Sequence, residues 1–177
     1  LTKIRTFVMN DLCNINNYKK YRKIYKPSNL ILKDNNFINK NIINYVNKNR
    51  KKSILLEYIV PFKNKFVKIN IISYNNNKLT YYDNLINKIL IAINLINNLF
   101  YNYNCNSKSL TITIYLIKIN KQFSLTENNT NSGYTYPCVL NGTITIFREE
   151  ECLKVIIHEL IHSFGYDKNY HFNKKIN

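Results

Sequence analysis

The order of hydrophobic periodicities along the chain constrains its fold more than any other sequence feature. Short runs rich in β-branched and aromatic residues, separated by a turn-like segment, predict two β-strands, over 54–60 and 66–74. Over 84–101 the apolar spacing changes to three or four residues, which predicts an amphipathic helix with Asp83 as its N-cap. A further strand is predicted over 110–119. Strands interleaved with a helix in this order predict an α+β fold built on a mixed sheet.

The last third of the chain predicts a hairpin followed by a helix. Residues 134–140 and 143–148 flank Asn141-Gly142, a pair that tolerates positive φ and predicts a type I′ turn between two strands. A helix is predicted over 149–164, and Gly165 is the residue expected to end it in a left-handed conformation.

Basic residues are concentrated in the first half of the chain. The net charge is +16, and residues 1–82 carry 17 Lys or Arg against three acidic residues, a balance of +14 that leaves +2 for the rest. We divide the chain into a basic accessory extension, 1–52, and a main domain, 53–177. The basic runs over 19–23 and 48–52 suit a solvated surface, or contact with an acidic protein or with the phosphates of a nucleic acid. They match no nucleic-acid-binding motif, which favours the solvated surface.

Cysteine spacing and hydropathy exclude two kinds of protein. Cys13, Cys105, Cys138 and Cys152 form no C-x-x-C pair, so a cysteine-based structural zinc site is not indicated. We expect free thiols and an intracellular location, with Cys152 as a small core residue. The longest apolar stretch, 89–100, is interrupted by asparagines and is too short to cross a bilayer, so no membrane span is predicted.

Two of the three histidines lie in one motif, His158-Glu159-Leu160-Ile161-His162, within the last predicted helix. Residues four apart share a helix face, so both imidazoles can bind one zinc ion. Glu159 is directed to the side of this pair, where it can take a proton from the zinc-bound water. The motif therefore predicts peptide-bond hydrolysis by a Glu-activated, zinc-bound water, with two surface histidines and a solvated glutamate as the plainer interpretation.

A catalytic zinc site needs a third protein ligand and an open position for water. The motif with Gly165 resembles the metzincin pattern H-E-x-x-H-x-x-G-x-x-H/D, in which the third ligand would fall at Lys168, a residue that does not ligate zinc at neutral pH. Here the chain departs from the pattern. The nearest candidates are Asp167, one residue earlier, and His171, three residues later, and a ligand elsewhere stays open.

The segment from Leu110 to Asp167 resembles zinc metallopeptidases encoded by large nucleocytoplasmic DNA viruses. The shared features are a strand, a polar loop, an arginine with an acidic pair and the metal-binding helix, which correspond here to Asn131-Ser132-Gly133-Tyr134-Thr135, Arg148, Glu150, Glu151, Lys154-Val155, His158-Glu159, His162, Phe164-Gly165 and Asp167. The recurrence of the aspartate in such a pattern favours Asp167 over His171 as the third ligand.

The wider resemblance is to zincins, which implies a mixed sheet, a backing helix and an HExxH active-site helix in residues 53–177. It also implies an edge strand that binds substrate in extended form, with Tyr134, Thr135 and Tyr136 as substrate-binding residues. A viral source would place the protein in the virion or the infected-cell cytoplasm.

The sequence thus predicts a viral zinc endopeptidase that acts on protein or peptide substrates. The alternative is a non-catalytic protein of the same zincin fold, in which zinc or the basic extension serves assembly or nucleic-acid binding.

The first prediction concerns the third zinc ligand. Asp167→Asn and His171→Gln each remove one candidate donor while nearly preserving side-chain shape, so only the variant at the true ligand should lose zinc affinity. Zinc titration with a competing chromophoric chelator measures both variants against the wild type. If neither variant loses affinity, the ligand lies elsewhere and both assignments are wrong.

Overall fold

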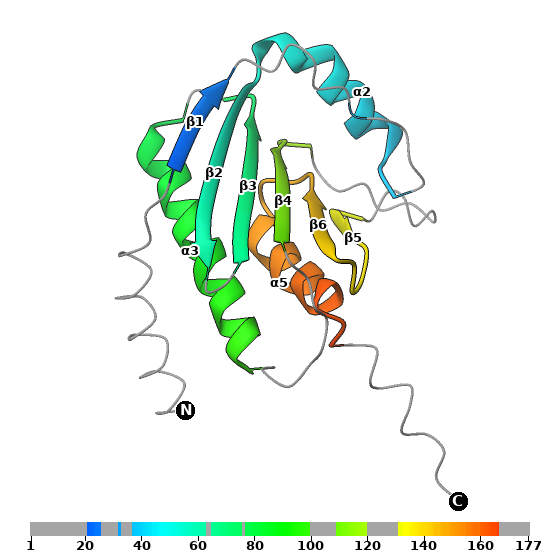
Figure 1. Ribbon diagram of the computed structural model, residues 1–177. Coiled ribbons are helices and arrows are strands. Elements are labelled where there is room, and N and C mark those ends of the chain that lie inside the picture. The colour runs from blue at the N-terminus through cyan, green and yellow to red at the C-terminus, as the bar shows by residue number, and fades with distance from the viewer. Residues whose placement is uncertain are drawn as a thin grey trace, which may run out of the picture.

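The computed structural model describes residues 21–25, 32, 37–62, 65–75, 77–99, 109–119 and 131–166. Its centre is a six-stranded mixed sheet with the spatial order β1-β2-β3-β4-β6-β5 (Figure 1). The strands are β1 (Tyr21–Tyr25), β2 (Ile54–Phe62), β3 (Lys65–Ser73), β4 (Ser109–Leu116), β5 (Gly133–Thr135) and β6 (Asn141–Ile146).

Strand directions make the sheet mixed. β1 and β2 are antiparallel, as are β2 and β3, whereas β4 runs parallel to both of its neighbours, β3 and β6. The short strand β5 lies at the end of the sheet and is antiparallel to β6. The predicted α+β fold with a mixed sheet is therefore confirmed.

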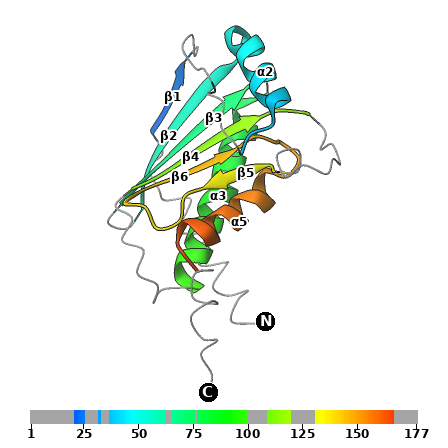
Figure 2. The same cartoon turned by 90° about the vertical axis from the view of Figure 1, so that its right-hand side faces the viewer.

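The helices divide between the two faces of the sheet. They are α2 (Lys40–Asn49), continued by a 3-10 turn over Arg50–Lys52, then α3 (Leu79–Leu99) and α5 (Cys152–Ser163). The helix α3 supplies the crossover that the parallel pair β3 and β4 requires. It lies side by side with α5, whereas α2 lies apart from both, near one end of the strands (Figures 1 and 2). No helix in the described ranges is long and apolar enough to cross a membrane.

Alternation along the strands supplies a separate core to each face. Ile71, Ile114 and Ile146 face α3 and α5, where they pack with Ile86, Ile89, Leu90, Ile156 and Leu160. Their immediate neighbours Ile72, Tyr115 and Phe147 face the other way and pack with Ile38, Ile42 and Val46. Both faces of the central strands are therefore buried.

The described parts of residues 1–52 belong to this architecture. Strand β1 pairs with β2 along five residues, and Ile42 and Val46 of α2 are almost fully buried against the sheet. Asn39 starts α2, because its side-chain oxygen accepts a hydrogen bond of 2.7 Å from the backbone N–H of Asn41. This segment thus covers the sheet face opposite α3 and α5.

The prediction that Asp83 caps the long helix is wrong. α3 begins at Leu79, so Asp83 lies inside the helix and accepts a hydrogen bond of 3.0 Å from the hydroxyl of Tyr58. The earlier start brings Tyr82 into the core, where its hydroxyl donates to Ser73 Oγ over 2.8 Å. Burial of an aromatic ring in the first turn outweighs the capping preference of Asp83.

The predicted type I′ turn at Asn141-Gly142 is also wrong, because both residues lie within β6. Pairing with the parallel strand β4 places Asn141 opposite Ser109, whose hydroxyl donates to the Asn141 side-chain oxygen over 3.0 Å. The chain reverses earlier, around Cys138, which has a φ of 56° and donates its backbone N–H to the carbonyl of Ser163 over 3.1 Å. Tertiary pairing therefore overrides the local turn preference.

The last helix begins at Cys152 rather than at Glu149, and its predicted end is confirmed. Gly165 has a φ of 73° and donates its N–H to the carbonyl of His162 over 2.9 Å. Tyr166 donates to the carbonyl of Ile161 over 3.1 Å, which completes a Schellman motif and reverses the chain after α5.

The second prediction tests the close approach of β5 to α5. A Cβ atom at Gly133 would lie 2.6 Å from Cγ1 of Val155 and 3.0 Å from the carbonyl oxygen of Thr145. We expect Gly133→Ala to lower the free energy of unfolding by about 1–3 kcal/mol through overpacking. Denaturant unfolding measures this change.

Val155→Ala removes the Cγ1 atom that a Cβ at Gly133 would meet, so it tests whether this contact causes the loss of stability. The double variant Gly133→Ala/Val155→Ala should lose less stability than the two single losses added together. Strict additivity would show that the two residues do not pack against each other as described.

Candidate active site

A buried stripe fixes the orientation of α5. Cys152, Ile156 and Leu160 follow each other at intervals of four and are all buried in the core shared with α3 and the sheet. The helix cannot rotate without exposing this stripe to water. The burial of this stripe therefore determines the directions in which His158, Glu159 and His162 leave the helix.

The two motif histidines meet at one point on the helix surface. Nε2 of His158 and Nε2 of His162 lie 2.9 Å apart, with ring centroids separated by 4.4 Å and ring planes at 88°. His158 is exposed and His162 is half-buried. Both nitrogens thus converge at a position that solvent can reach.

Glu159 is placed differently from the histidines. It is buried, with 7% of its surface exposed, on the side of α5 that faces the start of β5. Its carboxyl lines a cavity of about 260 Å³, whose walls are Asn131, Ser132, Gly133, Glu151, Lys154, Val155, His158 and Glu159. Burial raises the pKa of Glu159, and the nearby His162 partly offsets this rise. Glu159 thus combines a raised proton affinity with a place in the same cavity as His158.

The two imidazole nitrogens lie at a hydrogen-bond distance of 2.9 Å from each other. Two nitrogens bound to one tetrahedral zinc ion at about 2.0–2.1 Å would lie about 3.3 Å apart. The pair could therefore share a zinc ion if this hydrogen bond were replaced and the rings moved apart by a few tenths of an ångström. No group of three or more His, Cys, Asp or Glu that could hold a metal occurs among the described residues. The third-ligand candidates Asp167 and His171 lie outside the described residues, which end at Tyr166.

Two residues of this cavity were not assigned a role from sequence. The hydroxyl of Ser132 donates to Glu151 Oε2 over 2.5 Å, and this bond connects the loop before β5 to the start of α5. Ser132 is buried, as expected for a residue that fixes this connection. The sequence contained a signal for this contact, because Ser132 and Glu151 both lie in the segments on which the resemblance to viral metallopeptidases is based.

The predicted substrate-binding residues lie on and just after the edge strand. Tyr134 and Thr135 belong to β5, and Tyr136 follows it as an exposed residue. None of the three lines the cavity beside Glu159, which β5 reaches only through Gly133. The hydroxyl of Thr135 donates to the carbonyl of Thr143 over 2.7 Å and so serves the fold.

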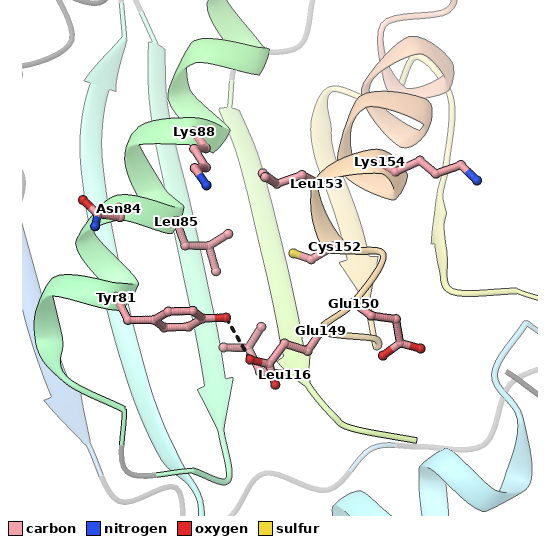
Figure 3. A pocket seen from close by; sticks show the side chains of 10 residues that line it. All are labelled: Tyr81, Asn84, Leu85, Lys88, Leu116, Glu149, Glu150, Cys152, Leu153 and Lys154. Carbon is pink, nitrogen blue, oxygen red and sulfur yellow. Dashed lines mark hydrogen bonds between the residues drawn. The ribbon is translucent and has the colours of Figure 1, made fainter. Parts of the chain in front are cut away.

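A larger cavity, of about 320 Å³, lies between α3 and α5 on another side of the last helix (Figure 3). Figure 3 shows Tyr81 of α3 directed towards Glu149. The Tyr81 hydroxyl donates a hydrogen bond of 2.9 Å to Glu149 Oε1. Burial, followed by this hydrogen bond, raises the pKa of Tyr81 and keeps it a neutral donor. The Tyr81–Glu149 hydrogen bond connects α3 to the residues that precede α5 across this cavity.

The cysteines contribute no thiolate to the histidine pair in the described part of the chain. Cys138 is disulfide-bonded, so the expectation of free thiols is wrong for this residue. Cys152 is a free, buried thiol, as predicted for a core residue. Burial, with a smaller contribution from Glu149, raises its pKa to about 12.

Exposed lysines continue the basic character of the first half of the chain. Lys48, Lys51 and Lys52 are exposed at the end of α2, whereas Lys68 forms an ion pair of 2.6 Å with Glu57 across β2 and β3. Contact of the exposed lysines with an acidic protein or a nucleic acid stays a prediction.

Comparisons with protein-family models, curated proteins and solved structures gave no match. The candidate site therefore rests on its own geometry and on the motif.

The third prediction concerns Cys152. Because its pKa is raised to about 12, roughly one thiol in 10⁴ is ionised at pH 8, and the side chain is also shielded from reagents. We expect iodoacetamide to leave Cys152 unmodified in the native protein and to alkylate it fully in guanidinium chloride. Peptide mass spectrometry identifies the modified residue, and rapid native alkylation of Cys152 would contradict the packing of α5.

Proposed function

We propose that this protein is a zinc-dependent metallopeptidase with a zincin-like catalytic unit. One observation carries the proposal: two imidazole Nε2 atoms meet 2.9 Å apart on α5 while Glu159 of the same helix lines the adjoining cavity. The burial of Glu159 beside the exposed His158 supports the proposal, because an ordinary surface carboxylate would be solvated. Asp167 is the third ligand that we favour, with His171 as the alternative.

The surroundings of α5 support a peptide substrate. β5 is the last strand of the sheet, antiparallel to β6, and Gly133 at its start lines the cavity that contains Glu159. An extended peptide can pair with such an edge through main-chain hydrogen bonds, which bring its carbonyl groups next to the histidine pair. The zincin resemblance assigns the same role to the edge strand beside an HExxH helix.

Each motif residue has a separate task in this proposal. His158 and His162 would hold the zinc ion, which would supply Lewis-acid polarisation of a substrate carbonyl and a water molecule of lowered pKa, about 7. Glu159 accepts the proton of the attacking water and later delivers it to the leaving amine. Ser132, Gly133 and Glu151 line the same cavity as Glu159.

The fourth prediction separates ligand from base. His158→Ala and His162→Ala each remove a coordination bond, so zinc content and peptidase activity should fall together. Glu159→Gln keeps the shape of the side chain, should retain zinc, and should lower kcat by at least about 10²- to 10⁴-fold. Metal analysis and cleavage of a fluorescent casein measure the two properties.

Ile157→Ala is the matched control, because this exposed residue of the same helix does not line the cavity. It should retain both zinc and activity. Full activity in Glu159→Gln would contradict the proposed mechanism. Stoichiometric zinc without any cleavage by the wild type would support the non-catalytic alternative.

A further inference from the structure

Three aromatic rings from two distant parts of the chain gather beside β5. Phe37, which precedes α2, stacks on Tyr134 with ring centroids 5.6 Å apart and planes at 21°. Tyr136 meets both rings edge to face, at 6.5 Å from Phe37 and 6.1 Å from Tyr134. Tyr134 also lies 6.1 Å from the ring of Phe147, which is fully buried. We call Phe37, Tyr134 and Tyr136 the aromatic platform.

Tyr134 is the anchored ring of the platform, and the other two rings are partly exposed. Tyr134 packs against the core beneath α2, whereas 44% of Phe37 and 50% of Tyr136 are exposed. Single exposed apolar residues are common on protein surfaces, but exposed rings in mutual contact make a contiguous patch. Such a patch is a candidate contact surface for a second molecule.

Strand geometry relates the platform to a peptide on β5. Within the described residues, β5 pairs on one side only, with β6. Gly133 faces α5, since a Cβ there would meet Val155, so Tyr134 faces the opposite side of the sheet. A peptide strand added to the free edge has the same alternation. Its side chains on the side away from α5 come within cross-strand reach of Tyr134 and Tyr136.

The platform and the candidate active site lie on opposite faces of the same edge strand, at neighbouring residues. Gly133 lines the cavity that contains His158 and Glu159, and Tyr134 is the next residue of the strand. One residue of a β-strand spans only about 3.3 Å. A single extended peptide can therefore contact the platform and the cavity at the same time.

We propose that the aromatic platform is a specificity subsite that selects a large aromatic or aliphatic side chain of the peptide substrate. This inference rests on the proposed peptidase function and names the substrate class. The tyrosine faces could also attract a lysine or arginine, but the net charge of +16 disfavours a cationic peptide. The selected side chain is thus an uncharged one, on the side of the substrate strand that faces away from α5.

The test uses binding, so that it does not depend on turnover. Two fluorescent octapeptides of Ala and Thr, identical except for Phe or Ala at one central position, are titrated by anisotropy into the Glu159→Gln protein. The Phe peptide should bind about two- to tenfold more tightly, as expected for one added aromatic contact. Tyr136→Ala or Phe37→Ala in this background should remove the difference.

Two further variants serve as controls. Tyr136→Phe keeps the ring and should retain the preference, and Phe66→Ala, an exposed ring on β3 away from the platform, should also retain it. Equal binding of both peptides to the Glu159→Gln protein, or a preference that survives Tyr136→Ala, would overturn the inference. These outcomes leave the zinc content and activity of the wild type untouched, so failure of the subsite and failure of the proposed function are distinguishable.

Discussion

Burial of one stripe of α5 is the interaction on which the candidate site depends. Cys152, Ile156 and Leu160 lie in the core between α3 and the sheet, so they fix how the helix is rotated. Given this rotation, His158 and His162 project to the surface together. The packing of ordinary apolar side chains thus determines the helix face on which the two histidines lie.

The contact between β5 and α5 determines what surrounds Glu159. Glycine at position 133 lets the edge strand approach Val155 closely, and the Ser132–Glu151 hydrogen bond ties the preceding loop to the start of the helix. As a result, Glu159 is shielded while His158 stays exposed. This difference in solvation is consistent with the separate roles that we propose for Glu159 and His158.

The periodic segments and the motif were predictable from the sequence, whereas their tertiary contacts were not. The strand patterns over 54–60 and 66–74 and the left-handed Gly165 depend on local rules, and the structure confirms them. The assignments of Asn141-Gly142 as a turn and Asp83 as a cap are wrong, because pairing with β4 and burial of Tyr82 are interactions between distant residues. The spacing of His158 and His162 predicted a shared face, but not the cavity beside Glu159. Nor could it predict Phe37 beside β5, since no local pattern connects residues about a hundred positions apart.

The central claim is that His158 and His162 hold one zinc ion with an open position for water. Extended X-ray absorption fine structure at the zinc K-edge of the purified wild-type protein tests this most directly. The account predicts four light scatterers at about 2.0–2.1 Å, with the outer-shell pattern of at least two imidazoles and no sulfur. A sulfur shell near 2.3 Å, a shell without imidazole, or a protein that carries no zinc after purification without chelator would contradict it.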